Sequence, residues 1–177
     1  NAHGTSEPSA ASSSFTPLNN RGIFIGGSAP SNVMDYITIS TDGNATDFGD
    51  LLSATGSVSN GAAASFTRGV VAGGLTSGGN INVIQYVTIA STGNATDFGD
   101  MTNVYASMGG HSSTTRGVYG GGLKNPGSNY NTVIEYITIA NTGNATDFGD
   151  LLSDSQFASA LGSSSRAVFK SQNNSNV

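Results

Sequence analysis

Most of the charged side chains of this 177-residue chain recur with each repeat and could form ion pairs. The octapeptide GNATDFGD occurs three times and supplies six of the eleven acidic residues, namely Asp47, Asp50, Asp97, Asp100, Asp147 and Asp150. All four arginines precede a short apolar segment, as Arg21, Arg68, Arg116 and Arg166. A guanidinium group can donate two parallel hydrogen bonds to one carboxylate. We therefore predict structural ion pairs between these arginines and the octapeptide aspartates, which would hold neighbouring strands in register.

The same octapeptide offers an alternative, because loops rich in Asn and Asp oxygens suit hard cations such as Ca²⁺. Asn44, Asp47 and Asp50 and their copies would then be the ligands. Too few acidic residues alternate here to complete a coordination sphere, and the arginines would compete for the carboxylates. The chain contains no cysteine, which excludes thiolate sites. We predict no bound metal, and we interpret the N-A-T triplets, which fit the glycosylation sequon, as turns.

Catalytic residue types are scarce. The chain has two histidines, His3 in a polar N-terminal segment and His111 in a Ser/Gly-rich stretch that occurs in one repeat. A Ser/His/Asp relay would have to be assembled around a single histidine. We predict that the protein is not an enzyme and needs no cofactor.

Composition excludes two further classes of protein. The net charge is −5 and the only lysines are Lys124 and Lys170, so no basic patch can neutralise phosphates and we predict no binding to nucleic acid. No apolar run approaches the roughly 18 residues that span a bilayer, so we predict no membrane insertion. The chain opens without Met or a signal-like apolar stretch, which is typical of a processed or trimmed product.

The elements that position these residues are repeats of roughly 48 residues, a period typical of four-stranded units. Each repeat runs from the arginine through a short strand and a double glycine to a strand such as VIEYITIA, then to the octapeptide and a weaker Ser/Ala-rich strand. β-branched and aromatic residues favour strands, and no segment shows helical periodicity with caps, so we predict an all-β chain. Neither face of VIEYITIA is polar, so we expect it to be covered on both faces.

We divide the chain into five segments. Residues 1–20 form a polar segment that contributes a strand over 8–15. Repeat 1 covers 21–67, repeat 2 covers 68–115 and repeat 3 covers 116–165, and residues 166–177 form a partial repeat with a polar tail.

The order of strand, double glycine, variable loop, V-I-E-Y strand, turn and aromatic strand resembles the kelch repeat. Phe48, Phe98 and Phe148 stand where that repeat has a tryptophan. The octapeptide and the strand before it also resemble kelch-like repeats in virion structural or tail-fibre-like proteins of marine phages and bacteria. The resemblance covers residues 21–169. It implies β-propeller blades, three with four strands and a partial fourth, and a virion or cell-surface location.

Terminal blades of an open array would expose strand edges and apolar faces, which invite association. We therefore predict a homo-oligomer, with two chains forming one closed ring, or alternatively a trimeric spike or a head-to-tail filament.

Sequence variation is concentrated in the loops that follow the double glycines, at 28–32, 75–82 and 123–132. Equivalent loops of a repeat array emerge on one face, and such loops often carry recognition. Tyr and Asn suit sugar rings through stacking and paired hydrogen bonds. We predict a binding site for a glycan or other host-surface polymer at Asn80, Lys124, Asn125, Asn129 and Tyr130. A purely structural subunit of a spike, collar or filament is the alternative function.

Overall fold

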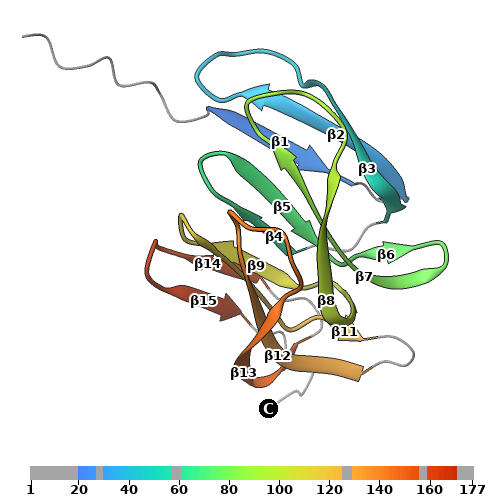
Figure 1. Cartoon of the computed structure of the whole chain (residues 1–177), viewed down its shortest axis with the longest axis vertical. Helices are drawn as coiled ribbons and strands as arrows, with labels where there is room; N and C mark the ends of the chain where they lie inside the picture. Colours follow the sequence, from blue (N-terminus) through green and yellow to red (C-terminus); the bar gives the residue numbers. More distant parts are fainter. Residues whose placement is uncertain (1–19, 27–29, 57–60, 125–128, 156–158, 171–177) are drawn as a thin grey trace, which may run out of the picture.

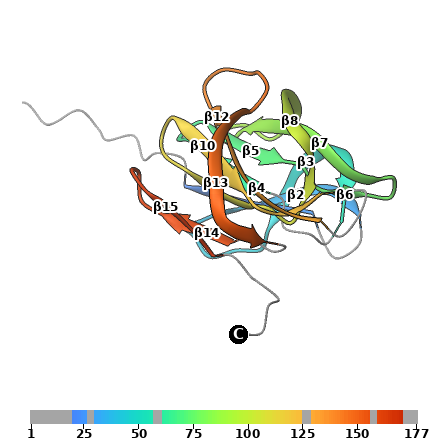
Figure 2. The same ribbon diagram turned by 90° about the horizontal axis from the view of Figure 1, so that it is seen from below.

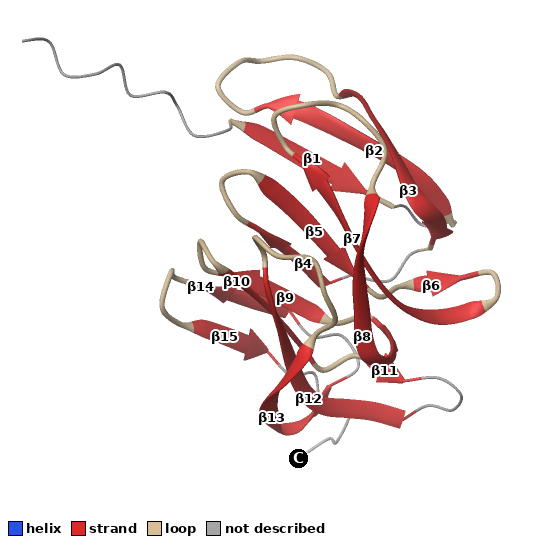
Figure 3. Cartoon of the chain, viewed as in Figure 1, coloured by secondary structure: helices blue, strands red, loops and turns tan. Residues whose placement is uncertain are grey.

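The computed structural model describes residues 20–26, 30–56, 61–124, 129–155 and 159–170. Every regular element in these ranges is a β-strand, which confirms the predicted all-β class (Figure 3). The strand predicted over 8–15 and the polar tail after Lys170 lie outside the described residues.

Most strands follow the repeats. Repeat 1 contains β1 (Arg21–Ile25), β2 (Ser31–Thr38), β3 (Thr46–Thr55) and β4 (Gly61–Ala64). Repeat 2 contains β5 (Arg68–Ala72), β6 (Leu75–Thr76), β7 (Gly79–Thr88), β8 (Thr96–Ala106) and β9 (Gly109–Ser112). Repeat 3 contains β10 (Arg116–Gly120), β11 (Leu123–Lys124), β12 (Asn129–Thr138), β13 (Thr146–Ser155) and β14 (Ser159–Gly162). The partial repeat contains β15 (Ala167–Lys170).

The described strands form three antiparallel sheets. One holds β1, β2 and β3, the second runs β4-β5-β7-β8-β11-β12-β10-β9 with β6 and β13 paired at its side, and the third is the β14–β15 hairpin. The repeats follow one another along the long axis of the molecule, with β1–β3 at one end and β12–β13 at the other (Figure 1). These described sheets do not close into a ring.

Each group of paired strands, which we call a sheet unit, begins one strand before the repeat boundary that the sequence predicts. β4 pairs with β5, β9 with β10 and β14 with β15, each through a turn that precedes or includes the repeat arginine. In the first of these turns the Ser65 hydroxyl accepts hydrogen bonds from the backbone N–H groups of Thr67 and Arg68, at 3.3 and 3.1 Å. Ser113 does the same in the second turn. The predicted boundaries at the arginines therefore cut through a hairpin that a serine stabilises locally.

The Tyr-containing strands are covered on both faces only where a repeat precedes them. On β7, Ile84 and Gln85 point to opposite faces of the sheet, and both are buried. This strand is therefore covered on both faces, as predicted. β2 occupies the same place in repeat 1, yet only Met34 is buried, while Asp35 is exposed. The larger hydrophobic core is made mainly from repeats 2 and 3, and the smaller core joins Met34, Phe48 and Leu51 to repeat 2.

A β-bulge interrupts each long hairpin within the octapeptide. In repeat 2 the register shifts between the pairs Ile84–Gly99 and Gln85–Asp97, which leaves Phe98 as the additional residue. Gly99 has a φ of +146° and lies so close to the next octapeptide that a Cβ atom there would be 2.5 Å from the Gly143 carbonyl carbon and oxygen. Glycine is therefore required at this position for both its backbone conformation and its lack of a side chain.

The equivalent glycine of repeat 3 provides a matched test of this close approach. Gly149 has a φ of +137°, but a Cβ atom there would meet nothing within 4 Å. Gly149→Ala should lower the free energy of unfolding by about 1–3 kcal/mol through backbone strain alone. Gly99→Ala should lower it by a further ~1–3 kcal/mol, because the next repeat must be displaced. Urea denaturation of both variants measures the difference, and equal losses would contradict the packing role.

Candidate functional site

The octapeptides join neighbouring repeats through their backbones. The N–H groups of Gly93 and Ala95 donate to the carbonyl oxygens of Phe48 and Asp50, at 2.7 and 2.8 Å. The Asn94 side-chain oxygen accepts the Asp50 N–H at 3.1 Å. Repeats 2 and 3 repeat this pattern with the same three types of bond. The turn GNA of one octapeptide thus binds the segment FGD of the octapeptide before it.

These hydrogen bonds involve the same octapeptide oxygens that the calcium-site alternative would use as ligands. The side-chain oxygens of Asn94 and Asn144 accept backbone N–H groups instead of standing free as ligands. In repeat 3 the Asp150 carboxylate accepts the Thr132 hydroxyl at 2.9 Å, and that of Asp147 accepts the Gly149 N–H at 3.2 Å. Within the described ranges no group of three acidic or histidine side chains is placed to hold a metal ion.

The partners of the arginines differ from the predicted carboxylates. One guanidinium nitrogen of Arg21 donates to the Ile89 carbonyl at 3.0 Å, and one of Arg68 donates to the carbonyls of Ile139 and Ala140 at 3.0 and 2.9 Å. Each arginine therefore reaches the next repeat just after its Tyr-containing strand. Among the described residues, the interactions of these guanidinium groups include no octapeptide aspartate, which corrects the expected pairs with Asp47, Asp50, Asp97, Asp100, Asp147 and Asp150. Arg166 is exposed.

The tyrosine of the same repeat fixes the direction of each guanidinium. Arg21 lies over Tyr36, Arg68 over Tyr86 and Arg116 over Tyr136, with the guanidinium carbon 4.5 to 4.6 Å from the ring centroid. Each tyrosine in turn meets the octapeptide phenylalanine edge to face, at centroid distances of 5.8, 5.9 and 6.1 Å. This Arg–Tyr–Phe stack is the same in all three repeats, so a cation–π contact and an aromatic pair orient the guanidinium.

A buried acceptor at the centre of the Tyr-containing strand completes each interface, and the sequence analysis did not identify it. Gln85 accepts the Leu52 N–H at 2.8 Å through its side-chain oxygen. Glu135 occupies the same place in repeat 3 and accepts the N–H and the hydroxyl of Thr102. Both side chains are 1% exposed. A polar residue that repeats in the middle of an apolar strand was the available signal, because buried polar groups need partners.

Burial changes the ionisation of Glu135. Loss of solvent raises the pKa of its carboxyl above the usual value, and the hydrogen bonds from Thr102 oppose this effect only in part. The pKa of the nearby Tyr105 phenol is also raised, first by burial and then by the negative charge of Glu135. The interface between repeats 2 and 3 therefore contains a carboxyl group whose charged form is less favourable than that of an exposed glutamate.

The described parts of the variable loops of repeats 2 and 3, at β6 and β11, lie on the same side of the molecule in Figure 1. The Asn80 side-chain amide donates to the Leu123 carbonyl at 2.8 Å, so this predicted ligand-binding residue bridges the two loops. Lys124 is exposed, and Tyr130, which pairs with Leu123, is half-buried. Asn125 and the side chain of Asn129 lie outside the described part of the chain.

His111, which we excluded from a catalytic relay, lies on β9 and contacts the Ser163 carbonyl through Nε2 at 3.1 Å.

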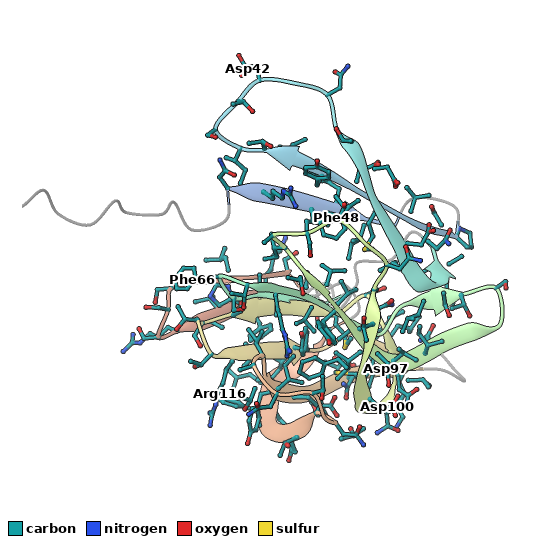
Figure 4. The ribbon with its side chains drawn as sticks, turned by 45° about the horizontal axis from the view of Figure 1, so that its top comes forward. Asp42, Phe48, Phe66, Asp97, Asp100 and Arg116 are labelled. Carbon is teal, nitrogen blue, oxygen red and sulfur yellow. The ribbon has the colours of Figure 1, made fainter. Side chains whose placement is uncertain are left out.

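Figure 4 shows Phe48 between the β1–β3 sheet and the strands of repeat 2, and Arg116 near the opposite end of the molecule. The described residues include no helix that is long and apolar enough to cross a membrane.

No protein-family model matches the chain, and no curated protein matches it. Among solved structures the chain is similar to that of YjhT, with a TM-score of 0.66 and 11% sequence identity. The match covers 80% of this chain and 51% of the other, so the chain spans about half the length of YjhT. At this identity the similarity shows a shared all-β fold.

Replacing the buried carboxyl tests its effect on stability. A carboxyl whose pKa is raised by folding stabilises the protein below its unfolded pKa, and this stabilisation is lost as the pH rises through the folded pKa. Glu135→Gln should therefore be more stable than the wild type at pH 7, and the difference should shrink towards pH 4. Urea denaturation across this range measures it. Gln85→Glu is the reverse control and should introduce the same pH dependence between repeats 1 and 2.

The arginines provide a second matched comparison. Arg68→Ala removes two charge-assisted hydrogen bonds to repeat 3 and should cost about 1.5–3 kcal/mol. Arg116→Ala removes the contact with Tyr136 and should cost below ~1 kcal/mol, a typical value for an exposed cation–π pair. Thermal or urea denaturation measures both. An equal cost would show that the bonds to the next repeat add nothing to stability.

Proposed function

We propose that the protein is a non-enzymatic recognition module of a virion, tail-fibre-like or cell-surface kind, which binds a glycan or other surface polymer through its variable loops. In this proposal the sheet units are kelch-like β-propeller blades. The observation that carries the proposal is that the loops of two successive repeats lie together at one edge and are linked by the Asn80–Leu123 hydrogen bond.

The loop edge has the chemistry that a sugar polymer requires. Tyr130 offers part of an aromatic face, and the exposed Lys124 amine can donate to hydroxyl or carboxyl groups. Asn80 positions one loop on the next, so two successive loops would form one extended surface. The identical octapeptides supply a constant frame at the other end of the long strands, where sequence variation would disturb packing between repeats.

A purely structural role, as a subunit of a virion spike, collar or extracellular filament, is the second candidate. The observation that favours it is the exposed end of the array, where Phe148 is uncovered although its counterparts in repeats 1 and 2 are buried. A homo-oligomer that covers this end belongs to the same proposal.

A glycan array probed with the intact chain tests the recognition function. Tyr130→Ala and Lys124→Ala should each weaken the bound signal by roughly tenfold, which corresponds to about 1.4 kcal/mol of lost contact. Thr142→Ala is the matched control, since this exposed residue lies in the turn at the opposite end of β12.

Unchanged binding in both loop variants would show that the loops are not the site. An array with no bound glycan would favour the structural role instead.

A further inference from the structure

Repeat 3 ends in a face that is covered in the other two repeats. The octapeptide phenylalanine is 2% exposed in repeat 1 and 3% in repeat 2, where the following repeat packs on it, but Phe148 is 56% exposed. Figure 2 views the molecule from this end, with β13 and the β14–β15 hairpin nearest the viewer. The Tyr136–Phe148 pair and Arg116 keep the geometry of the covered interfaces. We name this surface, formed by Arg116, Phe148, Asp150 and Leu152, the end face.

The polar groups of the end face correspond to those that bind the next repeat elsewhere. At the first interface, the Phe48 and Asp50 carbonyls and the Asp50 N–H bind the turn GNA of repeat 2. The Leu52 N–H binds Gln85, and Arg21 binds the carbonyl that follows the Tyr-containing strand. The end face presents the same set in Phe148, Asp150, Leu152 and Arg116. Among the described residues no GNA turn and no buried Gln or Glu faces these groups.

Within the described ranges, one edge of β15 beside the end face has no paired strand. β5 pairs with β4 on one side and β7 on the other, and β10 pairs with β9 and β12. β15 holds the same place after its arginine, but in the described part of the chain it pairs only with β14. In the other repeats a strand of the β7 and β12 type occupies the equivalent edge.

A groove of about 400 Å³ connects the two features. Its walls include side chains of the end face and of the partial repeat, among them Arg116, Val118, Ile134, Phe148, Arg166 and Phe169. The apolar side chains and the two arginines among these lining residues suit an apolar strand that ends in free backbone carbonyls.

We propose that the end face binds a two-stranded β-hairpin of this same repeat type, carried by a partner polypeptide. The first strand of the hairpin pairs with the free edge of β15. The GNA turn of the hairpin binds the backbone of Phe148 and Asp150. The Glu or Gln at the centre of the hairpin's first strand accepts the Leu152 N–H. Arg116 donates to the backbone carbonyl that follows this first strand. This inference is independent of the loop site.

The interfaces inside the chain explain why the partner must be of this type. A Cβ atom at Gly49 or Gly99 would lie 2.5 Å from the glycine of the following turn, so the two backbones approach too closely for larger residues. Gly149 leaves the same space open. The first residue of the incoming turn has a φ of +154° at Gly93 and +153° at Gly143, a conformation that favours glycine, as GNATDFGD has.

A hairpin fits better than a folded second copy of the chain. Repeat 1 carries the complementary groups, since Asn44 and Asp35 are exposed and Ile39 is 67% exposed. However, β1 precedes β2 as β10 precedes β12, so repeat 1 of a second copy would place its β1 where β15 already lies. A hairpin without such a strand meets no obstacle.

Binding of a labelled synthetic peptide of residues 129–155, the β12–β13 hairpin, to the intact chain tests the proposal by fluorescence anisotropy. We expect saturable binding to the wild-type chain. A peptide with Asn144→Ala loses the acceptor that corresponds to Asn94 and should bind about tenfold more weakly.

Variants of the chain locate the site. Gly149→Ala places a methyl group in the space for the incoming turn and should weaken binding at least tenfold, and Arg116→Ala should weaken it as well. Gly43→Ala is the control, because a Cβ atom there meets nothing within 4 Å and the residue lies in repeat 1. Arg116→Ala, which adds no backbone strain, keeps the test valid if Gly149→Ala unfolds the chain.

Two results would overturn the proposal. One is the absence of binding, or binding that neither Gly149→Ala nor Arg116→Ala weakens. The other is self-association of the chain, seen by analytical ultracentrifugation, that requires Phe148 and that the peptide does not displace, because a second copy would then occupy the end face.

Discussion

The arrangement of the repeats depends on one close contact between two stretches of backbone, the turn of one octapeptide and the bulged segment of the octapeptide before it. The glycine in that bulge permits a positive φ and leaves room for the next turn at a distance that no side chain would allow. Every other contact between repeats is compatible with this spacing, from the Asn acceptor to the buried phenylalanine.

The charged and polar side chains at the interfaces form hydrogen bonds mainly with backbone groups and less with one another. Arginines donate to carbonyl oxygens, and the buried Gln85 and Glu135 accept N–H groups that the bulged strands leave unpaired. A stacked tyrosine and phenylalanine restrict the guanidinium, which reduces the entropy lost when it bonds. In the described part of the chain, these contacts with the backbone hold the repeats in register.

The sequence predicted the strands and the importance of the octapeptide, because β-branched residues and exact repetition are visible without a structure. It did not predict the partners of Arg21 and Arg68, since a guanidinium can donate to a carboxylate or to backbone carbonyls and only the offset between repeats decides which lies within reach. The role of Gln85 was also missed, because alternation suggested two apolar faces. The loops at Asn80 and Lys124 were located by their variation, and their contact across repeats required coordinates.

Three identical octapeptides also have a consequence for folding kinetics. Each GNA turn is chemically able to dock on any FGD segment, so the sequence does not encode which repeat is the correct neighbour. Connection length has to make that choice, because the adjacent repeat closes the shorter loop and closes it sooner. Refolding at high concentration should consequently populate misassembled states in which repeats from different molecules exchange places.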